Sequence, residues 1–236
     1  MRQLEMPLKH WGGKRKRSGR KPVGLRSCVR RIKRPKLHDQ LPVHVTLRVL
    51  TDIPNLRVMA APITRALHAG AERYRFRLLH YSIQDNHLHL IAEADDARSF
   101  SRGMQGLAIR IARAVNRALS RKRGKVFSDR YHQRLLKTPT QARHALVYVI
   151  NNFKKHKRGL PARFIDHNHS SARYFARSGI AAPSSWLMRG GWKRAGDIEL
   201  ATAVPRSDRA DRRWRDLDAG PDALASSERS ASRQRR

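Results

Sequence analysis

Residues 85–92 have the sequence Asp-Asn-His-Leu-His-Leu-Ile-Ala, and they decide the fold because they place a turn directly before a strand. Asp and Asn favour turns because their side chains hydrogen-bond the nearby backbone. Alternate side chains of a strand lie on opposite faces of its sheet. We therefore expect one face to carry Leu88, Leu90 and Ala92 in the core, and the other to carry His87, His89 and Ile91.

Periodic patterns on both sides of this strand predict the remaining elements. In chain order these are a strand over 43–49, a helix over 55–72, a strand over 73–78, then the strand at 87–92, a helix over 97–120, a strand near 125–137 and a helix over 138–157. Thr138 or Thr140 can cap the last helix. The order β-α-β-β-α-β indicates an α+β class protein with a ferredoxin-like split βαβ fold. We expect a four-stranded antiparallel sheet with two helices on one face, the other face being free for a partner or for the last helix.

The charge of the chain is strongly unbalanced. Among 236 residues, 52 are Lys or Arg and 18 are Asp or Glu, which gives a formal net charge of +34. Such an excess attracts polyanions, of which nucleic acid is the commonest. On charge alone, a ribosomal or nucleoid-coating protein is an equal alternative to a DNA-acting enzyme.

Composition predicts four parts of the chain. Residues 1–40 carry 14 Lys or Arg and 2 acids and should form a disordered basic arm. Residues 41–158 form the folded domain, 159–204 a small appendage with Trp186 and Trp192, and 205–236 a disordered tail. Cys28 is the single cysteine, which fits a reducing, cytoplasmic setting. We find no secretory signal and no apolar run long enough to span a membrane.

The paired histidines can perform metal chemistry. Because His87 and His89 are two apart on a strand, both imidazoles project from one sheet face and can hold a single ion. The alternative is a solvent-facing pair with no ligand, and the His-x-His pattern alone does not exclude it.

A second pattern lies on the last helix. Tyr148 and Asn152 are four residues apart and therefore lie on one helical face. The neighbouring apolar face would dock the helix on the domain, leaving Tyr148 at the edge of that contact. A tyrosine that packs its ring and hydrates its hydroxyl is the ordinary alternative.

Taken together, the His-hydrophobic-His strand, the basic helix and the Tyr-x-x-x-Asn helix resemble the single-tyrosine HUH transposases, and most closely the REP-associated tyrosine transposase branch. The resemblance covers about residues 42–157. It implies cleavage and rejoining of single-stranded DNA through a 5′-phosphotyrosine link, with a divalent metal, Mg²⁺ or Mn²⁺. His87, His89 and Asn152 would be metal ligands and Tyr148 the nucleophile. Phe153 stands where many members have proline, and the adjacent Asn151 is an alternative ligand.

Several further residues are candidates for DNA contact or for the reaction. The helix stripe of Arg110, Arg113 and Arg117, together with Lys14, Arg15, Lys16 and Arg17 of the arm, is expected to contact phosphates. We interpret Tyr131 as a structural or base-stacking residue, His144 as a solvated helix position, and the second His-x-His, at His167 and His169, as part of a loop.

The favoured hypothesis is therefore an active transposase, or a domesticated relative, that cuts and rejoins single-stranded DNA near hairpin or palindromic repeats, with a homodimer as the assembly to test. A DNA-binding protein of the same fold that does not cut is the first alternative. A basic RNA-binding protein without enzymatic activity is the second. Only the first hypothesis requires the metal and the tyrosine.

Overall fold

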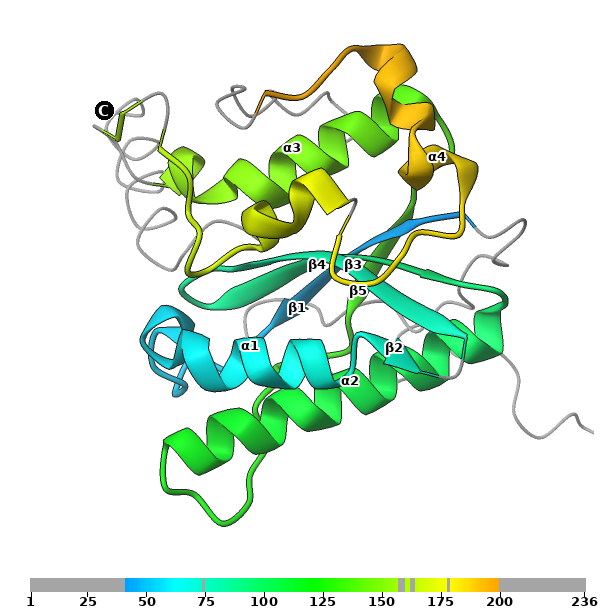
Figure 1. The fold of residues 1–236 in the computed structure, drawn as a ribbon. Coiled ribbons are helices and arrows are strands. Elements are labelled where there is room, and N and C mark those ends of the chain that lie inside the picture. The colour runs from blue at the N-terminus through cyan, green and yellow to red at the C-terminus, as the bar shows by residue number, and fades with distance from the viewer. Residues whose placement is uncertain (1–40, 74, 157–159, 162–163, 178, 200–236) are drawn as a thin grey trace, which may run out of the picture. The chain divides into compact units, whose positions relative to one another are not determined.

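A computed structural model of the chain describes residues 41–199 except 74, 157–159, 162–163 and 178 (Figure 1). The predicted basic arm, with Lys14, Arg15, Lys16 and Arg17, and the predicted tail over 205–236 lie outside the described residues. The main elements are β1 (Val43–Arg48), η1 (Leu56–Met59), α1 (Ala60–Ala69), β2 (Glu72–Arg73), β3 (Phe76–Ile83), β4 (His87–Ala94), α2 (Ala97–Ala118), β5 (His132–Leu135) and α3 (Pro139–His156). They are followed by η2 (Ser171–Arg177), α4 (Trp186–Arg189) and η3 (Gly191–Ala195).

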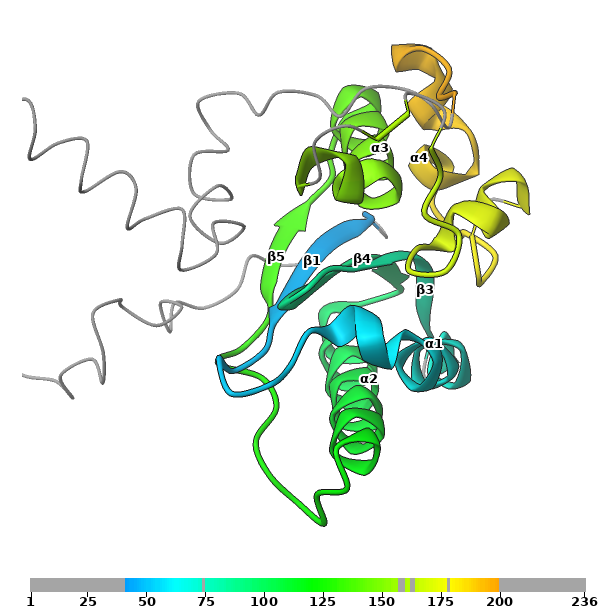
Figure 2. The ribbon, with the colours of Figure 1, turned by 90° about the vertical axis from the view of Figure 1, so that its left-hand side faces the viewer.

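The strands form one antiparallel sheet in the order β2-β3-β4-β1-β5. Without the two-residue β2, this is the strand order of the expected split βαβ fold. Helices α1 and α2 cover one face of the sheet and α3 covers the other (Figures 1 and 2). The predicted α+β class and antiparallel sheet are confirmed. None of the described helices is long and apolar enough to cross a lipid bilayer.

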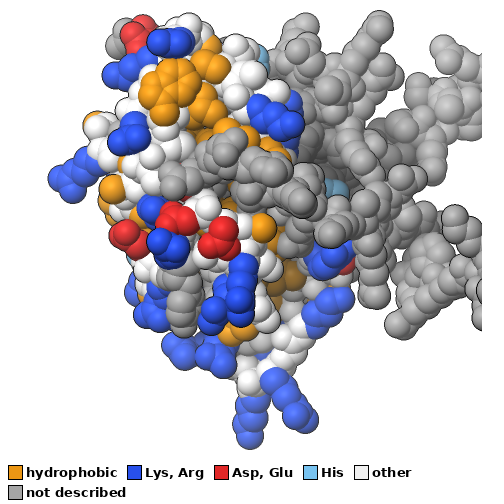
Figure 3. Space-filling model, turned by 90° about the vertical axis from the view of Figure 1, so that its right-hand side faces the viewer, with side chains coloured by type: hydrophobic (Ala, Val, Ile, Leu, Met, Phe, Trp, Pro, Cys, Tyr) orange, Lys and Arg blue, Asp and Glu red, His pale blue; other side chains and the backbone are white. Residues whose placement is uncertain are grey.

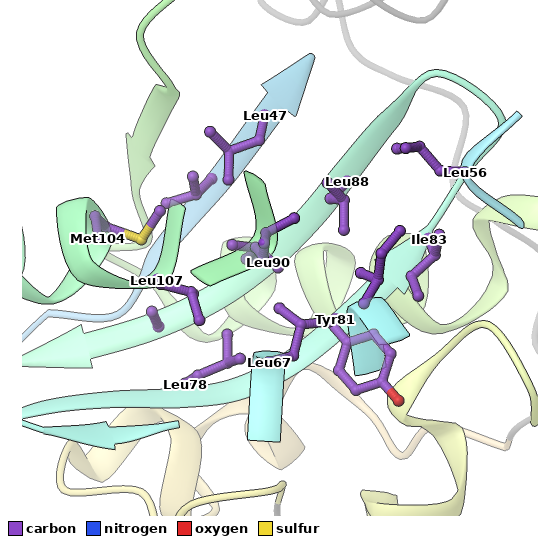
Figure 4. Close-up of a cluster of buried hydrophobic side chains, with 14 of the residues drawn as sticks. Leu47, Leu56, Leu67, Leu78, Tyr81, Ile83, Leu88, Leu90, Met104 and Leu107 are labelled. Carbon is purple, nitrogen blue, oxygen red and sulfur yellow. The ribbon is translucent and has the colours of Figure 1, made fainter. Parts of the chain in front are cut away.

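Two clusters of buried apolar side chains join the sheet to the helices on its two faces. The larger one fills the space between the sheet and helices α1 and α2, and Leu88 and Leu90 contribute to it as expected (Figure 4). The smaller one, which includes Leu79, Ile91 and Leu146, lies between the sheet, α3 and the segment after it. The sheet is therefore buried on both faces, and α3 is a structural layer as well as the carrier of Tyr148.

Two of the expected strands have different bounds. The strand predicted over 73–78 is β3, which extends to Ile83, preceded by β2 and a turn in which Arg75 has a φ of 61°. Residues 78–83 of β3 are buried on both faces. A register shift between Leu78 and His80 interrupts the apolar alternation where the predicted strand ends. The strand predicted near 125–137 is only β5, with an isolated bridge between Val49 and Phe127 before it.

Both long helices begin at the capping residues that their sequences offer. The Asp96 side chain caps α2 by accepting hydrogen bonds from the Ser99 N–H and hydroxyl at 2.7 and 2.8 Å. These bonds hold the pKa of the Asp96 carboxyl below its usual value. Thr138 caps α3 by accepting from the Gln141 N–H, as expected.

The two glycines of α2 give a matched test of this packing. A Cβ at Gly103 would lie 2.2 Å from Phe76 Cγ, whereas a Cβ at Gly106 would meet nothing within 4 Å. We expect Gly103→Ala to lower the free energy of unfolding by about 1–3 kcal/mol through overpacking. Gly106→Ala should raise it by up to about 1 kcal/mol, because alanine favours the helix. Urea unfolding followed by circular dichroism measures both, and equal effects would contradict the α2–β3 packing.

Candidate active site

β4 carries His87 and His89 side by side on the sheet face that α3 covers. Their Nε2 atoms are 2.9 Å apart, and the ring centroids are 4.6 Å apart. The two side chains are 3% and 0% exposed. Of the two occupants expected for this face, a partner or the last helix, it is the last helix, α3, that covers it and places the pair in the interior (Figure 1). The alternative of a solvent-facing pair is therefore wrong.

Neighbouring polar groups fix the orientation of both rings. The Asn86 side-chain oxygen lies 2.7 Å from His87 Nδ1, which must donate to it, so the lone pair of a neutral His87 lies on Nε2. Thr46 Oγ1 lies 3.1 Å from His89 Nδ1. A hydroxyl both donates and accepts, so Thr46 accommodates either tautomer of His89. The Nε2 lone pairs of both rings can thus be directed at one point between them.

Tyr148 of α3 lies against this pair. Its ring is 5.0 Å from the His89 ring, centroid to centroid, at an interplanar angle of 80°. The tyrosine is half-buried, as its predicted place at the edge of the docking face requires. The fold therefore brings together two residues that are 59 positions apart in the sequence.

His44 of β1 is a member of this cluster that the sequence interpretation did not single out. Its ring centroid lies 5.3 Å from that of His89 and 5.7 Å from that of Tyr148. The sequence did contain a signal for it, because His44 and Thr46 alternate with valine and leucine and so occupy the polar face of the first strand. Their relevance depends on β1 pairing with β4, where Thr46 stands opposite His89.

Asn151 and Asn152 are both buried on α3, with 2% and 0% of their surfaces exposed. Asn152 is the residue one helical turn beyond Tyr148. Neither its Oδ1 nor its Nδ2 has a hydrogen-bond partner among the described residues. A buried amide normally satisfies both atoms. This orphaned amide therefore fits a ligand position, on the same helix face as Tyr148.

An arginine shows where the end of α3 lies. The Arg57 guanidinium stacks over the Phe153 ring, 3.7 Å from its centroid. It also donates to the Ile83 carbonyl at 3.1 Å and to Asp166 at 2.6 Å. Ile83 stands opposite Leu88 in the sheet. These contacts place Phe153, the residue after Asn152, beside the end of the β3–β4 hairpin at which Leu88 lies.

The donor set fits a divalent cation. Metal–nitrogen bonds are about 2.0–2.1 Å long, so two Nε2 atoms 2.9 Å apart can reach the same ion. No cluster of three or more His, Cys, Asp or Glu side chains suited to a metal is found within the described ranges. An ion at the histidine pair would thus need a ligand of another kind, and the buried Asn152 amide is the candidate for it.

The other candidates lie apart from this cluster. Arg110, Arg113 and Arg117 lie on α2, on the sheet face opposite α3 (Figure 2). Tyr131 precedes β5 and packs against Phe100, with ring centroids 6.1 Å apart. His144 is exposed on α3, as expected. His167 and His169 lie in a turn, also as expected, and His169 contacts Asp166 and Arg57.

Comparison with known families places this domain. Residues 41–153 match the family described as "Transposase IS200 like". This domain belongs to the IS200-like transposase family. The matched range runs from two residues before β1 to one residue beyond Asn152. It contains the whole cluster of His44, His87, His89 and Tyr148.

One solved structure is also similar to the chain. The chain matches a REP-associated tyrosine transposase solved bound to a REP hairpin, with 15% sequence identity and a TM-score of 0.49. The match covers 76% of this chain and 99% of that chain. No protein of curated function matches the sequence.

Proposed function

We propose that this IS200-like transposase cuts and rejoins single-stranded DNA, with Tyr148 as the nucleophile. The observation that supports this most is the ring contact of Tyr148 with His89, next to a second imidazole nitrogen 2.9 Å away. A nucleophile beside two nitrogen atoms that can bind one metal ion is an arrangement suited to metal-assisted phosphodiester cleavage.

The reaction exchanges one phosphodiester for another. Tyr148 Oη attacks the phosphorus, a tyrosyl O–P bond forms, and the bond from phosphorus to the 3′-oxygen breaks. The hydroxyl proton leaves to solvent and the departing 3′-oxygen takes one up, giving a 5′-phosphotyrosine and a free 3′-hydroxyl. Because the bond type is conserved, the reverse attack by a 3′-hydroxyl rejoins a strand without ATP.

The proposed reaction needs a metal ion near the tyrosine and ligands that are held in place. A tyrosine hydroxyl has a pKa near 10 in water and is a weak nucleophile at neutral pH. A divalent cation held by His87, His89 and Asn152 would polarise a phosphate oxygen and offset the charge of the transition state. Mg²⁺ or Mn²⁺ is the ion expected to act in the reaction with this mixed set of nitrogen and oxygen ligands, although zinc could bind the same ligands as tightly or more tightly. Thr46 and Asn86 orient the two imidazole rings by contacting the Nδ1 atoms of His89 and His87. At metal sites, groups that hydrogen-bond the ligands commonly have this role.

We further propose that the arginines of α2 contact phosphates. Arg113 and Arg117 are exposed and Arg110 is partly buried. Because α2 and α3 lie on opposite faces of the sheet, a DNA molecule that reaches both must pass around an edge of the sheet (Figure 2). A hairpin with a single-stranded extension has the two parts that this placement needs. Whether a homodimer forms is a separate proposal, testable by sedimentation.

A cleavage assay tests the proposed activity. End-labelled single-stranded DNA that covers both flanks of the gene is incubated with the full chain and Mg²⁺ or Mn²⁺, and in parallel with a chelator. We expect cut strands only with the metal, and little cutting of the matching duplex. Tight binding without cutting under all conditions would instead favour the non-cutting DNA-binding protein.

The two asparagines give a prediction about ligation. We expect Asn152→Ala to weaken Mn²⁺ binding and to slow cleavage by roughly 10- to 100-fold, because an oxygen ligand is lost. Asn151→Ala is the matched control, since it removes a similarly buried amide from the preceding position. This variant should retain most of the Mn²⁺ affinity and most of the cleavage rate. Calorimetric titration with Mn²⁺ and the cleavage rate measure the two effects. A larger loss in Asn151→Ala would assign the ligand to Asn151.

A further inference from the structure

An exposed tryptophan lies in the segment that follows α3. Trp186 begins α4 and is 51% exposed. In the described part of the chain only Val58 and Ile109 are also large, apolar and exposed. One exposed apolar side chain is ordinary on a protein surface. Exposure alone therefore does not indicate a binding role for Trp186, and the residues around its ring decide whether it can bind a ligand.

The surroundings of Trp186 are basic, and its ring is held in place. A Cβ at Gly191 would lie 2.7 Å from the ring, so the indole packs directly on the Gly191 backbone. The Arg194 guanidinium lies over the ring at 5.1 Å from its centroid. Residues 186–195 also contain Arg189 and Lys193 and no acidic residue. The side of the molecule on which α4 lies shows apolar side chains bordered by Lys and Arg (Figure 3).

A buried carboxylate ties this segment to the strand of the active site. Glu93 of β4 is fully buried, and its oxygens accept hydrogen bonds from the backbone N–H and the hydroxyl of both Ser184 and Ser185. Ser185 in turn caps α4 by accepting from the Met188 N–H. Glu93 stands on the same strand as His87 and His89. The beginning of α4 is thereby fixed relative to the histidine pair.

A second connection joins the end of the segment to α3. Arg143 donates from Nε to the Gly196 carbonyl and from Nη2 to the Asp197 carbonyl, each at 2.9 Å. Arg143 lies five residues before Tyr148 on the same helix. Trp186 is therefore part of a surface that is anchored to both elements of the active site.

We propose that Trp186 and Arg194 form a base-stacking site for single-stranded nucleic acid. Exposed aromatic rings beside cations bind such strands by stacking on bases and by attracting phosphates, with little sequence preference. This inference rests on the proposed function, because it assigns the ligand as the strand that Tyr148 cuts. A base stacked on Trp186 holds that strand at a fixed place relative to the nucleophile.

Binding of fluorescent single-stranded DNA of mixed sequence tests the site. All proteins carry Tyr148→Phe and are assayed with a chelator, so that neither cleavage nor metal affects the result. Trp186→Ala should weaken binding about 5- to 100-fold, whereas Trp186→Phe should retain most of it. Val58→Ala removes another exposed apolar side chain and should leave binding unchanged.

Abasic positions identify the contact as stacking. One base at a time is removed along the oligonucleotide. We expect at least one abasic position to weaken binding to the Trp186 protein while having no further effect on Trp186→Ala. If Trp186→Ala binds as tightly as its parent, or if abasic losses are the same in both, the stacking site is wrong. Because no cleavage is measured, that result leaves the proposed activity of Tyr148 untouched.

Discussion

His89→Ala should slow strand cleavage by about a thousandfold while leaving the affinity for single-stranded DNA nearly unchanged. His89 is fully buried at the centre of the cluster, where it contacts His87, Thr46 and Tyr148. Loss of the proposed metal ligand should remove several kcal/mol of charge stabilisation from the transition state, and each 1.36 kcal/mol corresponds to a factor of ten in rate. Single-turnover cleavage of an end-labelled strand measures the rate, and fluorescence anisotropy measures binding.

A buried histidine outside the cluster supplies the control. His80 of β3 is 1% exposed, and its Nδ1 lies 3.1 Å from Ser171 Oγ. His80→Ala deletes the same side chain from the neighbouring strand, so thermal unfolding should show a comparable loss of stability. It should nevertheless cleave at a rate much closer to that of the unaltered protein. Equal cleavage rates for His89→Ala and His80→Ala would mean that the imidazole of His89 has no chemical role.

Tyr148→Phe should lower cleavage by more than about ten-thousandfold, the scale of loss when a nucleophile is deleted. The substitution removes one oxygen and keeps the ring, so the contacts with His89 and His44 persist. Folding, metal binding and DNA affinity are therefore expected to stay close to those of the unaltered protein. The cleavage assay and a melting curve together separate loss of chemistry from loss of structure.

Tyr131→Phe is the corresponding control for a second tyrosine. Tyr131 is half-buried and packs with Phe100 in the layer between the sheet and α2. It therefore lies on the sheet face that α1 and α2 cover, whereas the histidine pair lies on the face that α3 covers. Cleavage should continue in Tyr131→Phe, and a loss there as large as in Tyr148→Phe would contradict the assignment of the nucleophile.

Local periodicity predicted those elements whose two faces differ. β4 was predicted from residues 87–92, because leucines alternate with histidines there. The histidines are nevertheless as buried as the leucines. A sequence pattern reports polarity, whereas burial of a polar face depends on which helix packs on it. The extent of β3 was missed because a register shift between Leu78 and His80 interrupts the alternation at the point where the predicted strand ends.

The candidate site shows where spacing is informative and where it is not. The separations of two between His87 and His89 and of four between Tyr148 and Asn152 each define one face, so each pair could be proposed from its sequence. The contacts of His44 with Tyr148 and of Arg57 with Phe153 join residues about 100 positions apart. Such contacts depend on sheet order and helix placement, and no local pattern encodes them. The attachment of Ser184 and Ser185 to Glu93 is of the same kind.

Identification of the residue that becomes linked to DNA tests the central claim most directly. The full chain is incubated with Mn²⁺ and single-stranded DNA that covers the flanks of the gene. The covalent product is isolated on a denaturing gel, and the digested adduct is sequenced by mass spectrometry. We predict a 5′-phosphate linked to the peptide that contains Tyr148, and no adduct with chelator or in Tyr148→Phe. An adduct on Tyr131, or one that persists in Tyr148→Phe, would contradict the proposed mechanism.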